Sequence, residues 1–134
     1  MVKQPMKKQI LIIEDDSSVR FLLALFLKEH FDIITKADGL EGMLWLDSGN
    51  IPDLIMADID MPRLNGYEFI RNIRKSGFFR EIPIIMLSGW DSEEARNRCF
   101  SEGASLFMVK PFNPSDLLKN IKQLITDSKE IRYV

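Results

Sequence analysis

The chain has 134 residues, the length of one compact domain, since domains average about 100–200 residues. It carries 20 acidic and 18 basic side chains, and this near-neutral balance does not favour a protein that binds nucleic acid or a membrane surface. A hydrophobic fraction of 46% excludes intrinsic disorder. Because Cys99 and His30 are each the only residue of their type, an internal disulfide, a multi-cysteine zinc site and a two-histidine metal site are excluded as well.

No segment resembles a membrane span or a signal peptide. The longest apolar run, Phe21 to Leu27, is far shorter than the roughly 20 residues that cross a bilayer. No apolar segment of signal-peptide length follows the lysines near the start of the chain. We therefore expect a cytoplasmic protein, which also fits its single cysteine.

Short apolar runs alternate along the chain with segments of helical period. Such runs predict strands of a parallel sheet covered on both faces. In chain order the predicted strands are Ile10–Ile13, Ile33–Thr35, Leu54–Ala57, Ile84–Leu87 and Leu106–Val109. The second run is the weakest and is flanked by charged residues, which predicts an edge strand.

The segments between these runs predict helices. The first has apolar residues at the spacing of a stripe that faces a core, namely Val19, Leu22, Leu23, Phe26 and Leu27. Similar stripes occur at Phe69–Ile73 and Leu117–Ile125. Capping signals mark further helix starts at Asp38 with Glu41, Asp91 with Glu94, and Asn113 before Pro114.

Five strands alternating with five helices predict a three-layer α/β sandwich with a parallel sheet. We expect residues 1–9 to form an N-terminal extension, residues 10–127 the domain and residues 128–134 a short C-terminal tail. In such a fold the ligand site lies beyond the carboxyl ends of the strands.

Polar residues follow four of the predicted strands. Glu14, Asp15 and Asp16 come after the first strand, Asp58 and Asp60 after the third, Ser88 and Gly89 after the fourth, and Lys110 after the fifth. A single acid after a strand is often only a helix cap, as Asp16 or Ser17 is expected to be. Carboxylates from two strands at one edge would repel each other, and a divalent cation would neutralise them. Oxygen ligands without histidine or cysteine favour Mg²⁺.

These residues, in this order, resemble the receiver domains of bacterial two-component response regulators, of which the chemotaxis response regulator is the nearest familiar shape. The resemblance rests on Glu14–Asp16, Met56–Pro62 with Asn65 and Gly66, Leu87–Gly89, Gly103–Ser105 and Val109–Phe112. It implies a flavodoxin-like (βα)5 fold with strand order 2-1-3-4-5.

The resemblance also implies a role for each matching residue. Asp58 would accept the phosphoryl group. Asp15 and Asp58 would bind Mg²⁺ through their side chains, Glu14 through water, and Asp60 through its main-chain carbonyl. Lys110 and Ser88 would contact the phosphoryl oxygens, and Gly89 would leave the group open to a donor or to water.

Some positions depart from the commonest family pattern or vary within it. Phe107 replaces the usual switch tyrosine and lacks its hydroxyl group, so it is either a switch residue together with Ser88 or simply part of the core. The resemblance implies that Asp60 and Trp90 flank the phosphorylation pocket and tune the lifetime of the phosphoryl group; the alternative is that both are solvent-exposed residues without effect. Arg96 and Arg98, on the sparsely apolar fourth helix, belong either to a partner-binding face or to a solvated surface.

The leading hypothesis is a phosphoacceptor signalling module that is not an enzyme, apart from slow self-dephosphorylation. Its partners would be a sensor histidine kinase or phosphotransfer protein and an unknown effector, with no direct contact to nucleic acid or membrane, and it would be a monomer or weak dimer. We expect no output domain in this chain, which acts through a partner or is a piece of a larger regulator or hybrid kinase. The alternatives are an aspartate-nucleophile phosphatase that uses Asp58 and Asp60, and a degenerate receiver that serves as a scaffold.

Overall fold

A computed structural model describes residues 7–132, which form five parallel strands and five helices in strict alternation. The strands are β1 (Gln9–Ile13), β2 (Asp32–Lys36), β3 (Leu54–Asp58), β4 (Ile84–Ser88) and β5 (Leu106–Val109). They pair in the order β2-β1-β3-β4-β5, which confirms the order implied by the resemblance. The weakest predicted strand, β2, lies at the edge of the sheet, as its flanking charges indicated.

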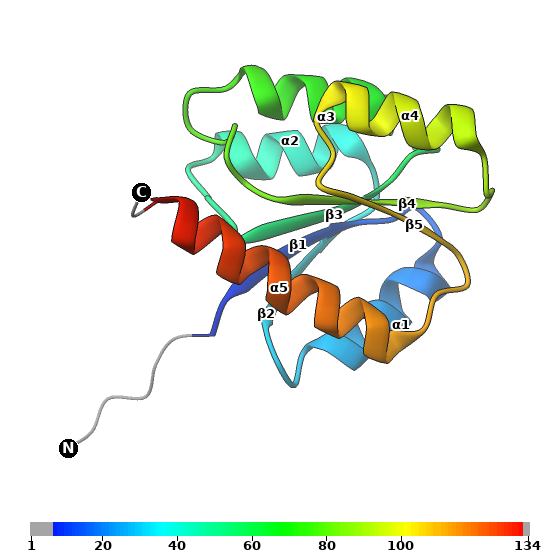
Figure 1. The fold of residues 1–134 in the computed structure, drawn as a ribbon, viewed down its shortest axis with the longest axis horizontal. Helices are drawn as coiled ribbons and strands as arrows, with labels where there is room; N and C mark the ends of the chain where they lie inside the picture. Colours follow the sequence, from blue (N-terminus) through cyan, green and yellow to red (C-terminus); the bar gives the residue numbers. More distant parts are fainter. Residues whose placement is uncertain (1–6, 133–134) are drawn as a thin grey trace.

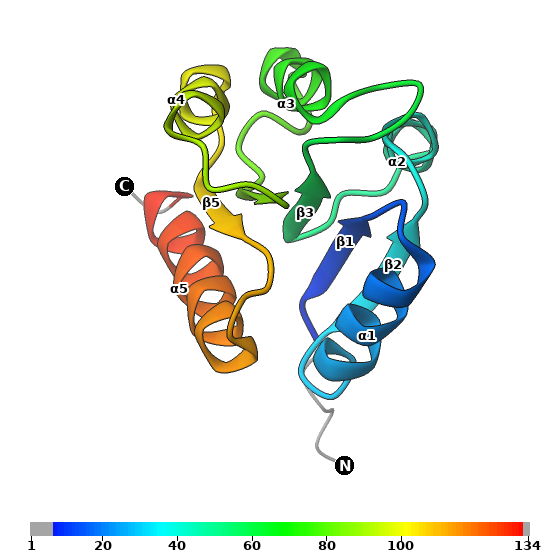
Figure 2. The same ribbon diagram turned by 90° about the vertical axis from the view of Figure 1, so that its right-hand side faces the viewer.

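The helices form two layers, one on each face of the sheet. They are α1 (Ser17–Leu27), α2 (Gly39–Asp47), α3 (Gly66–Lys75), α4 (Glu93–Glu102) and α5 (Pro114–Arg132). Helices α1 and α5 cover one face, and α2, α3 and α4 cover the other (Figure 1, Figure 2). Helix α5 continues to Arg132, so the backbone of residues 128–132, expected as a tail, is helical. No helix in the described part of the chain is both long and apolar enough to cross a membrane.

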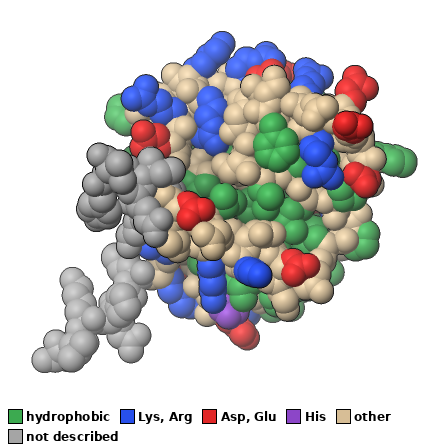
Figure 3. All heavy atoms as spheres, viewed as in Figure 1, with side chains coloured by type: hydrophobic (Ala, Val, Ile, Leu, Met, Phe, Trp, Pro, Cys, Tyr) green, Lys and Arg blue, Asp and Glu red, His purple; other side chains and the backbone are tan. Residues whose placement is uncertain are grey.

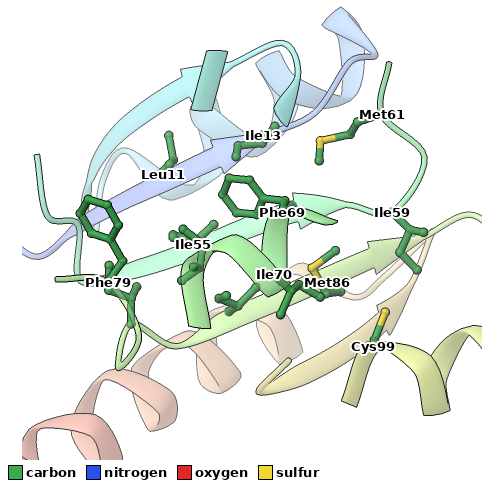
Figure 4. Packing of buried hydrophobic residues seen from close by; sticks show 14 of the residues in the cluster. Leu11, Ile13, Ile55, Ile59, Met61, Phe69, Ile70, Phe79, Met86 and Cys99 are labelled. Carbon is green, nitrogen blue, oxygen red and sulfur yellow. The ribbon is translucent and has the colours of Figure 1, made fainter. Parts of the chain in front are cut away.

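The sheet separates two hydrophobic clusters. The strand side chains alternate between them, since Leu11 and Ile13 face α2 and α3 while Ile10 and Ile12 face α1 and α5. Phe69 of α3 is fully buried at the centre of the first cluster (Figure 4). Every residue of β3 and β4 is buried, which explains why these two strands are apolar almost throughout.

Strand register places the polar residues that follow the strands at one edge of the sheet. Ile13 pairs with Ala57, so Glu14 and Asp58 come next to each other on neighbouring strands. Ser88 pairs with Val109, which brings Lys110 to the same edge. Backbone pairing between the strands therefore brings Glu14, Asp58, Ser88 and Lys110 to the same edge of the sheet.

Local capping signals explain most helix starts. Asp16, Asp38 and Asn65 each accept a hydrogen bond from a backbone N–H in the first turn of the helix that follows. The predicted cap at Asp91 is wrong by one residue, because the side chain that caps α4 is Ser92, which accepts from the N–H of Ala95 at 3.1 Å.

Helix α1 differs from its predicted packing. Leu23 and Leu27 are buried, but Leu22 of the same stripe is 62% exposed, and its neighbour Phe21 is 65% exposed. Leu22 lines a groove between α1 and the start of α5, which lies across the sheet from α1 (Figure 2), whereas Phe21 lies on the side of β2. Four large apolar side chains of α1, namely Phe21, Leu22, Leu25 and Phe26, are therefore exposed to solvent.

Gly66 permits α3 to begin directly behind Asp58. A Cβ atom at this position would lie 2.7 Å from the Cα of Ile59 and 2.8 Å from the carbonyl oxygen of Asp58. We predict that Gly66→Ala lowers the free energy of unfolding by about 1–3 kcal/mol, because backbone atoms cannot move away cheaply. Chemical denaturation would measure the loss. Gly77→Ala is the matched control, since its Cβ would meet nothing within 4 Å, and an equal loss in both variants would contradict the prediction.

Candidate functional site

The predicted acidic residues lie in a pocket at the carboxyl edge of the sheet. Asp58 is the last residue of β3, the central strand, and is only 6% exposed. Glu14 follows β1 and is fully buried, whereas Asp15 next to it is exposed. The pocket thus holds one buried, one nearly buried and one solvent-facing carboxylate.

Lys110 joins the two less exposed carboxylates. Its Nζ atom donates to Oε1 of Glu14 at 2.5 Å and to Oδ2 of Asp58 at 2.9 Å. Its backbone N–H donates to the carbonyl of Ser88 at 2.8 Å, which extends the pairing of β4 and β5 by one residue. The sheet itself therefore holds the ammonium group between the two acids.

Burial determines the protonation of Glu14. Loss of solvent, together with the neighbouring carboxylate of Asp58, raises the pKa of Glu14 to about 7, although Lys110 opposes the shift. The second carboxylate oxygen of Glu14, Oε2, is a buried atom with no hydrogen-bond partner among the described residues. Burial lowers the pKa of Lys110, but its bonds to Glu14 and Asp58 outweigh this and raise the pKa overall. One ammonium group thus leaves an excess of negative charge in the pocket.

Three carboxylates are close enough to share one cation. Oxygen atoms of Glu14, Asp15 and Asp58 lie within 4.8 Å of one another. An all-oxygen set with an unsatisfied buried oxygen fits a hard divalent cation such as Mg²⁺. The carboxylate of Asp60 is not part of this group and is exposed, while its backbone N–H donates to Oδ1 of Asp58 at 3.3 Å.

Arg20 is a residue of the site that sequence reasoning missed. Its guanidinium group reaches back from α1 and donates to the carbonyl of Glu14 at 2.7 Å. This bond holds the backbone between β1 and α1, on which Glu14 and Asp15 lie. The only available signal was the position of an arginine four residues after the cap Asp16, and that spacing does not by itself indicate a contact.

The hydroxyl group of Ser88 is engaged by its own loop. Its oxygen accepts from the backbone N–H of Trp90 at 3.0 Å and donates to the carbonyl of Trp90 at 2.9 Å. Trp90 itself is 74% exposed, and Gly89 between them has open space around its Cα. The hydroxyl group of Ser88 thus bonds only within its own loop, whereas its backbone carbonyl pairs with Lys110 after β5.

Phe107 lies inside the protein. It is 5% exposed and belongs to the cluster beneath α3 and α4, and the guanidinium carbon of Arg96 lies 4.8 Å from the centre of its ring. Arg98 lies in the same way over Tyr67, at 3.9 Å. The two arginines of α4 therefore cover aromatic rings of β5 and α3. They had been expected on a partner-binding face or a solvated surface, and neither expectation included these contacts.

A groove runs beside the pocket, between α1 and the start of α5. It has a volume of about 560 Å³ and is lined by Lys110 and Gly89 of the site and by apolar residues that include Leu22, Phe26 and Phe112. The groove therefore connects the acidic pocket to the exposed apolar side of α1.

Comparison with known proteins agrees with this geometry. The sequence model of the response regulator receiver domain matches residues 10–122. The hybrid signal transduction histidine kinase D of Dictyostelium discoideum is 30% identical over 128 residues, which are 96% of this chain and 8% of the kinase. The chain thus spans only a small part of that relative.

Two solved structures show the same fold. The chemotaxis response regulator CheY4 of Vibrio cholerae has a TM-score of 0.81 and 31% identity, covering 89% of this chain and 99% of CheY4. The receiver domain of the sensor histidine kinase PA1611 of Pseudomonas aeruginosa, solved with a magnesium ion coordinated in its active-site cleft, has a TM-score of 0.81 and 26% identity, covering 90% and 98%.

The family match covers most of the chain, and the strand order and the acidic pocket agree with it. The chain belongs to the response regulator receiver domains, the phosphoacceptor signalling domains of two-component systems.

Proposed function

We propose that this chain accepts a phosphoryl group on Asp58 from a phosphohistidine of a sensor histidine kinase or phosphotransfer protein. The observation that carries the proposal is the hydrogen bond from Lys110 to Asp58 at the end of the central strand. A carboxylate oxygen of Asp58 would form the new bond to phosphorus as the P–N bond of the phosphohistidine breaks, and the imidazole would leave with a proton. Lys110 would remain beside the phosphoryl oxygens and neutralise part of their charge.

Glu14, Asp15 and Asp58 are the side chains that would hold Mg²⁺, with the main-chain carbonyl of Asp60 as a further ligand. The cation would supply positive charge against the phosphoryl oxygens. The unpartnered buried oxygen of Glu14 supports this assignment, because a buried acceptor without a donor is costly unless a water or cation satisfies it.

Asp15 allows the metal site to be tested. In the absence of metal, we predict that Asp15→Asn stabilises the fold by about 0.5 kcal/mol, because it removes one of three like charges, and solvent screens an exposed group. The same change should weaken Mg²⁺ binding by at least about 10-fold. Loss of a residue that only hydrogen-bonds to a metal ligand already has an effect of that size. Thermal unfolding with EDTA and with Mg²⁺ would measure both effects. Asp16→Asn is the control, since asparagine keeps the cap of α1; if Mg²⁺ stabilises Asp15→Asn as much as it stabilises this control, the assignment is contradicted.

The phosphoacceptor itself is tested by intact mass. We predict that incubation with a small phosphodonor and Mg²⁺ adds one phosphoryl group, and that Asp58→Asn abolishes the adduct, because an amide oxygen cannot form an acyl phosphate. Asp60→Asn is the matched control and should still form the adduct. An unmodified wild-type protein would refute the proposal. Multiple turnover on a phosphate ester would instead favour the phosphatase, and an absent adduct together with intact partner binding would favour the scaffold.

We propose that the loop after β4 is the trigger of the response. A phosphorylated Asp58 offers new acceptor oxygens, for which the Ser88 hydroxyl would exchange its bond to the carbonyl of Trp90. Movement of this loop would shift α4 and the neighbouring Phe107, and so alter the face formed by α4, β5 and α5. A band of hydrophobic side chains crosses that face where β5 lies between the two helices (Figure 3). Asp60 and Trp90, which lie two residues after Asp58 and Ser88, would tune hydrolysis of the acyl phosphate, and Gly89 would leave it open to a donor or to water.

The exposed side of α1 is the surface that we propose contacts the phosphodonor protein. Phe21 and Leu22 project from a helix in which Arg20 is the one charged residue, and the adjoining groove opens onto Lys110. A donor that lies against this apolar side would bring its histidine to the mouth of the pocket.

The proposed contact with the donor protein can be tested separately from the chemistry at Asp58. Phe21→Ala combined with Leu22→Ala should slow phosphorylation by a histidine kinase or phosphotransfer protein at least about 10-fold, since large apolar side chains dominate the energy of such interfaces. Transfer from a small phosphodonor should not change, because neither side chain contacts Asp58. Leu44→Ala, which truncates an equally exposed leucine on α2, is the control. Equal slowing with both kinds of donor would show that the substitutions damage the pocket instead.

A further inference from the structure

Arg63 has an unusual backbone conformation close to the site. Among residues 7–132 it is the one residue other than glycine with a positive φ, at 69°. Side chains with a Cβ atom rarely adopt this conformation, which suits glycine. The surrounding structure must therefore hold Arg63 there.

An ion pair with Asp38 provides that hold. The Nε and Nη2 atoms of Arg63 both donate to Oδ2 of Asp38, at 2.9 and 2.5 Å, while Oδ1 of Asp38 accepts from the N–H of Glu41 at 2.9 Å. Asp38 is only 7% exposed. Burial on its own would raise the pKa of Asp38, but the N–H of Glu41 and the guanidinium of Arg63 lower it overall. One carboxylate thus caps α2 and binds the β3–α3 loop at the same time.

The first turn of α2 also fits tightly against this loop. A Cβ atom at Gly39 would lie 2.4 Å from the carbonyl oxygen of Leu64 and 3.2 Å from the Cε of Met61. The loop is therefore held from one side by packing and at its tip by the Arg63–Asp38 pair. Its first residues are Ile59 and Asp60, which directly follow Asp58.

We propose that Arg63 is a positioning residue for the cation site: its pair with Asp38 orders the β3–α3 loop and keeps Asp60 beside Asp58. The inference rests on the proposed Mg²⁺ site and deepens it. Arg63 does not touch the pocket; it acts through the backbone between residues 59 and 63. The loop would be able to move without the pair, and Mg²⁺ would have to order it on binding at a cost in affinity.

Two variants separate this role from local strain. Arg63→Gly removes the pair but also relieves the unfavourable φ, and Asp38→Asn removes the charge while its side-chain oxygen can still cap α2. We expect each to raise the dissociation constant for Mg²⁺ about 10-fold, the lower end of the range for outer-shell partners of metal ligands. The double variant should bind Mg²⁺ no more weakly than either single variant, because each substitution removes the same ion pair.

Calorimetric titration of the whole chain with Mg²⁺ alone would measure these constants, and thermal unfolding in EDTA would confirm that each variant is folded. Arg71→Ala is the control, since it breaks the comparable Arg71–Glu102 pair on the exposed surface of α3 and α4. Arg63→Lys, which keeps the charge, should recover part of the affinity. Unchanged affinity in both Arg63→Gly and Asp38→Asn would overturn this inference alone. A wild-type chain that does not bind Mg²⁺ would overturn the proposed cation site and this inference with it.

Discussion

The ammonium group of Lys110 is the interaction on which the site depends. Glu14 and Asp58 would repel each other strongly in a pocket that excludes most water, and Lys110 bonds to both. One positive charge does not balance the three carboxylates that meet there. The remaining negative charge gives the pocket its affinity for a cation, and the cation and Lys110 together would make it a suitable place for a phosphoryl group. Lys110, Glu14 and Asp58 thus determine both the charge balance of the pocket and the chemistry proposed for it.

This arrangement requires the whole sheet. Glu14 and Lys110 follow β1 and β5, and Asp58 ends β3; parallel pairing through helical crossovers is what brings the ends of those strands to one edge. The central strands are buried on both faces, so their residues are apolar until the chain emerges at that edge. The first polar residue after each strand is therefore the first one available for the site.

Apolar side chains are covered by arginines at the surface of α4 but are exposed on α1. On α4 the arginines Arg96 and Arg98 cover the rings of Phe107 and Tyr67, so charge and hydrophobic surface are combined there. On α1, by contrast, Phe21 and Leu22 are left open, and Leu22 lines the groove beside the pocket. Exposed apolar residues on a helix next to a reactive site carry a solubility cost, which contact with a partner would offset. The two faces are thus suited to different contacts.

The sequence by itself determined the five strands, the α/β class, the caps Asp38 and Asn113 and, through the order of its motifs, the acidic pocket. These features depend on local periodicity and on residues within a few positions of one another. Sequence periodicity also predicted that α1 is amphipathic, but not that Leu22 would remain uncovered, because exposure depends on how far α5 lies across the sheet. The N-cap of α4 was predicted one residue too early because Asp91 and Ser92 are adjacent and both have side chains that are able to cap a helix.

Only the tertiary structure decided which polar groups bond to each other. Arg63 and Asp38 are 25 residues apart, and Lys110 and Glu14 are 96 apart. Nothing in the sequence around Arg63 indicates that it has a positive φ, since the carboxylate of Asp38 and the first turn of α2, which contact this loop, come from a distant part of the chain. The inward position of Phe107 under Arg96 has the same origin. A hydrogen bond or stacked pair depends on where the backbone places both partners, and that placement exists only in the folded chain.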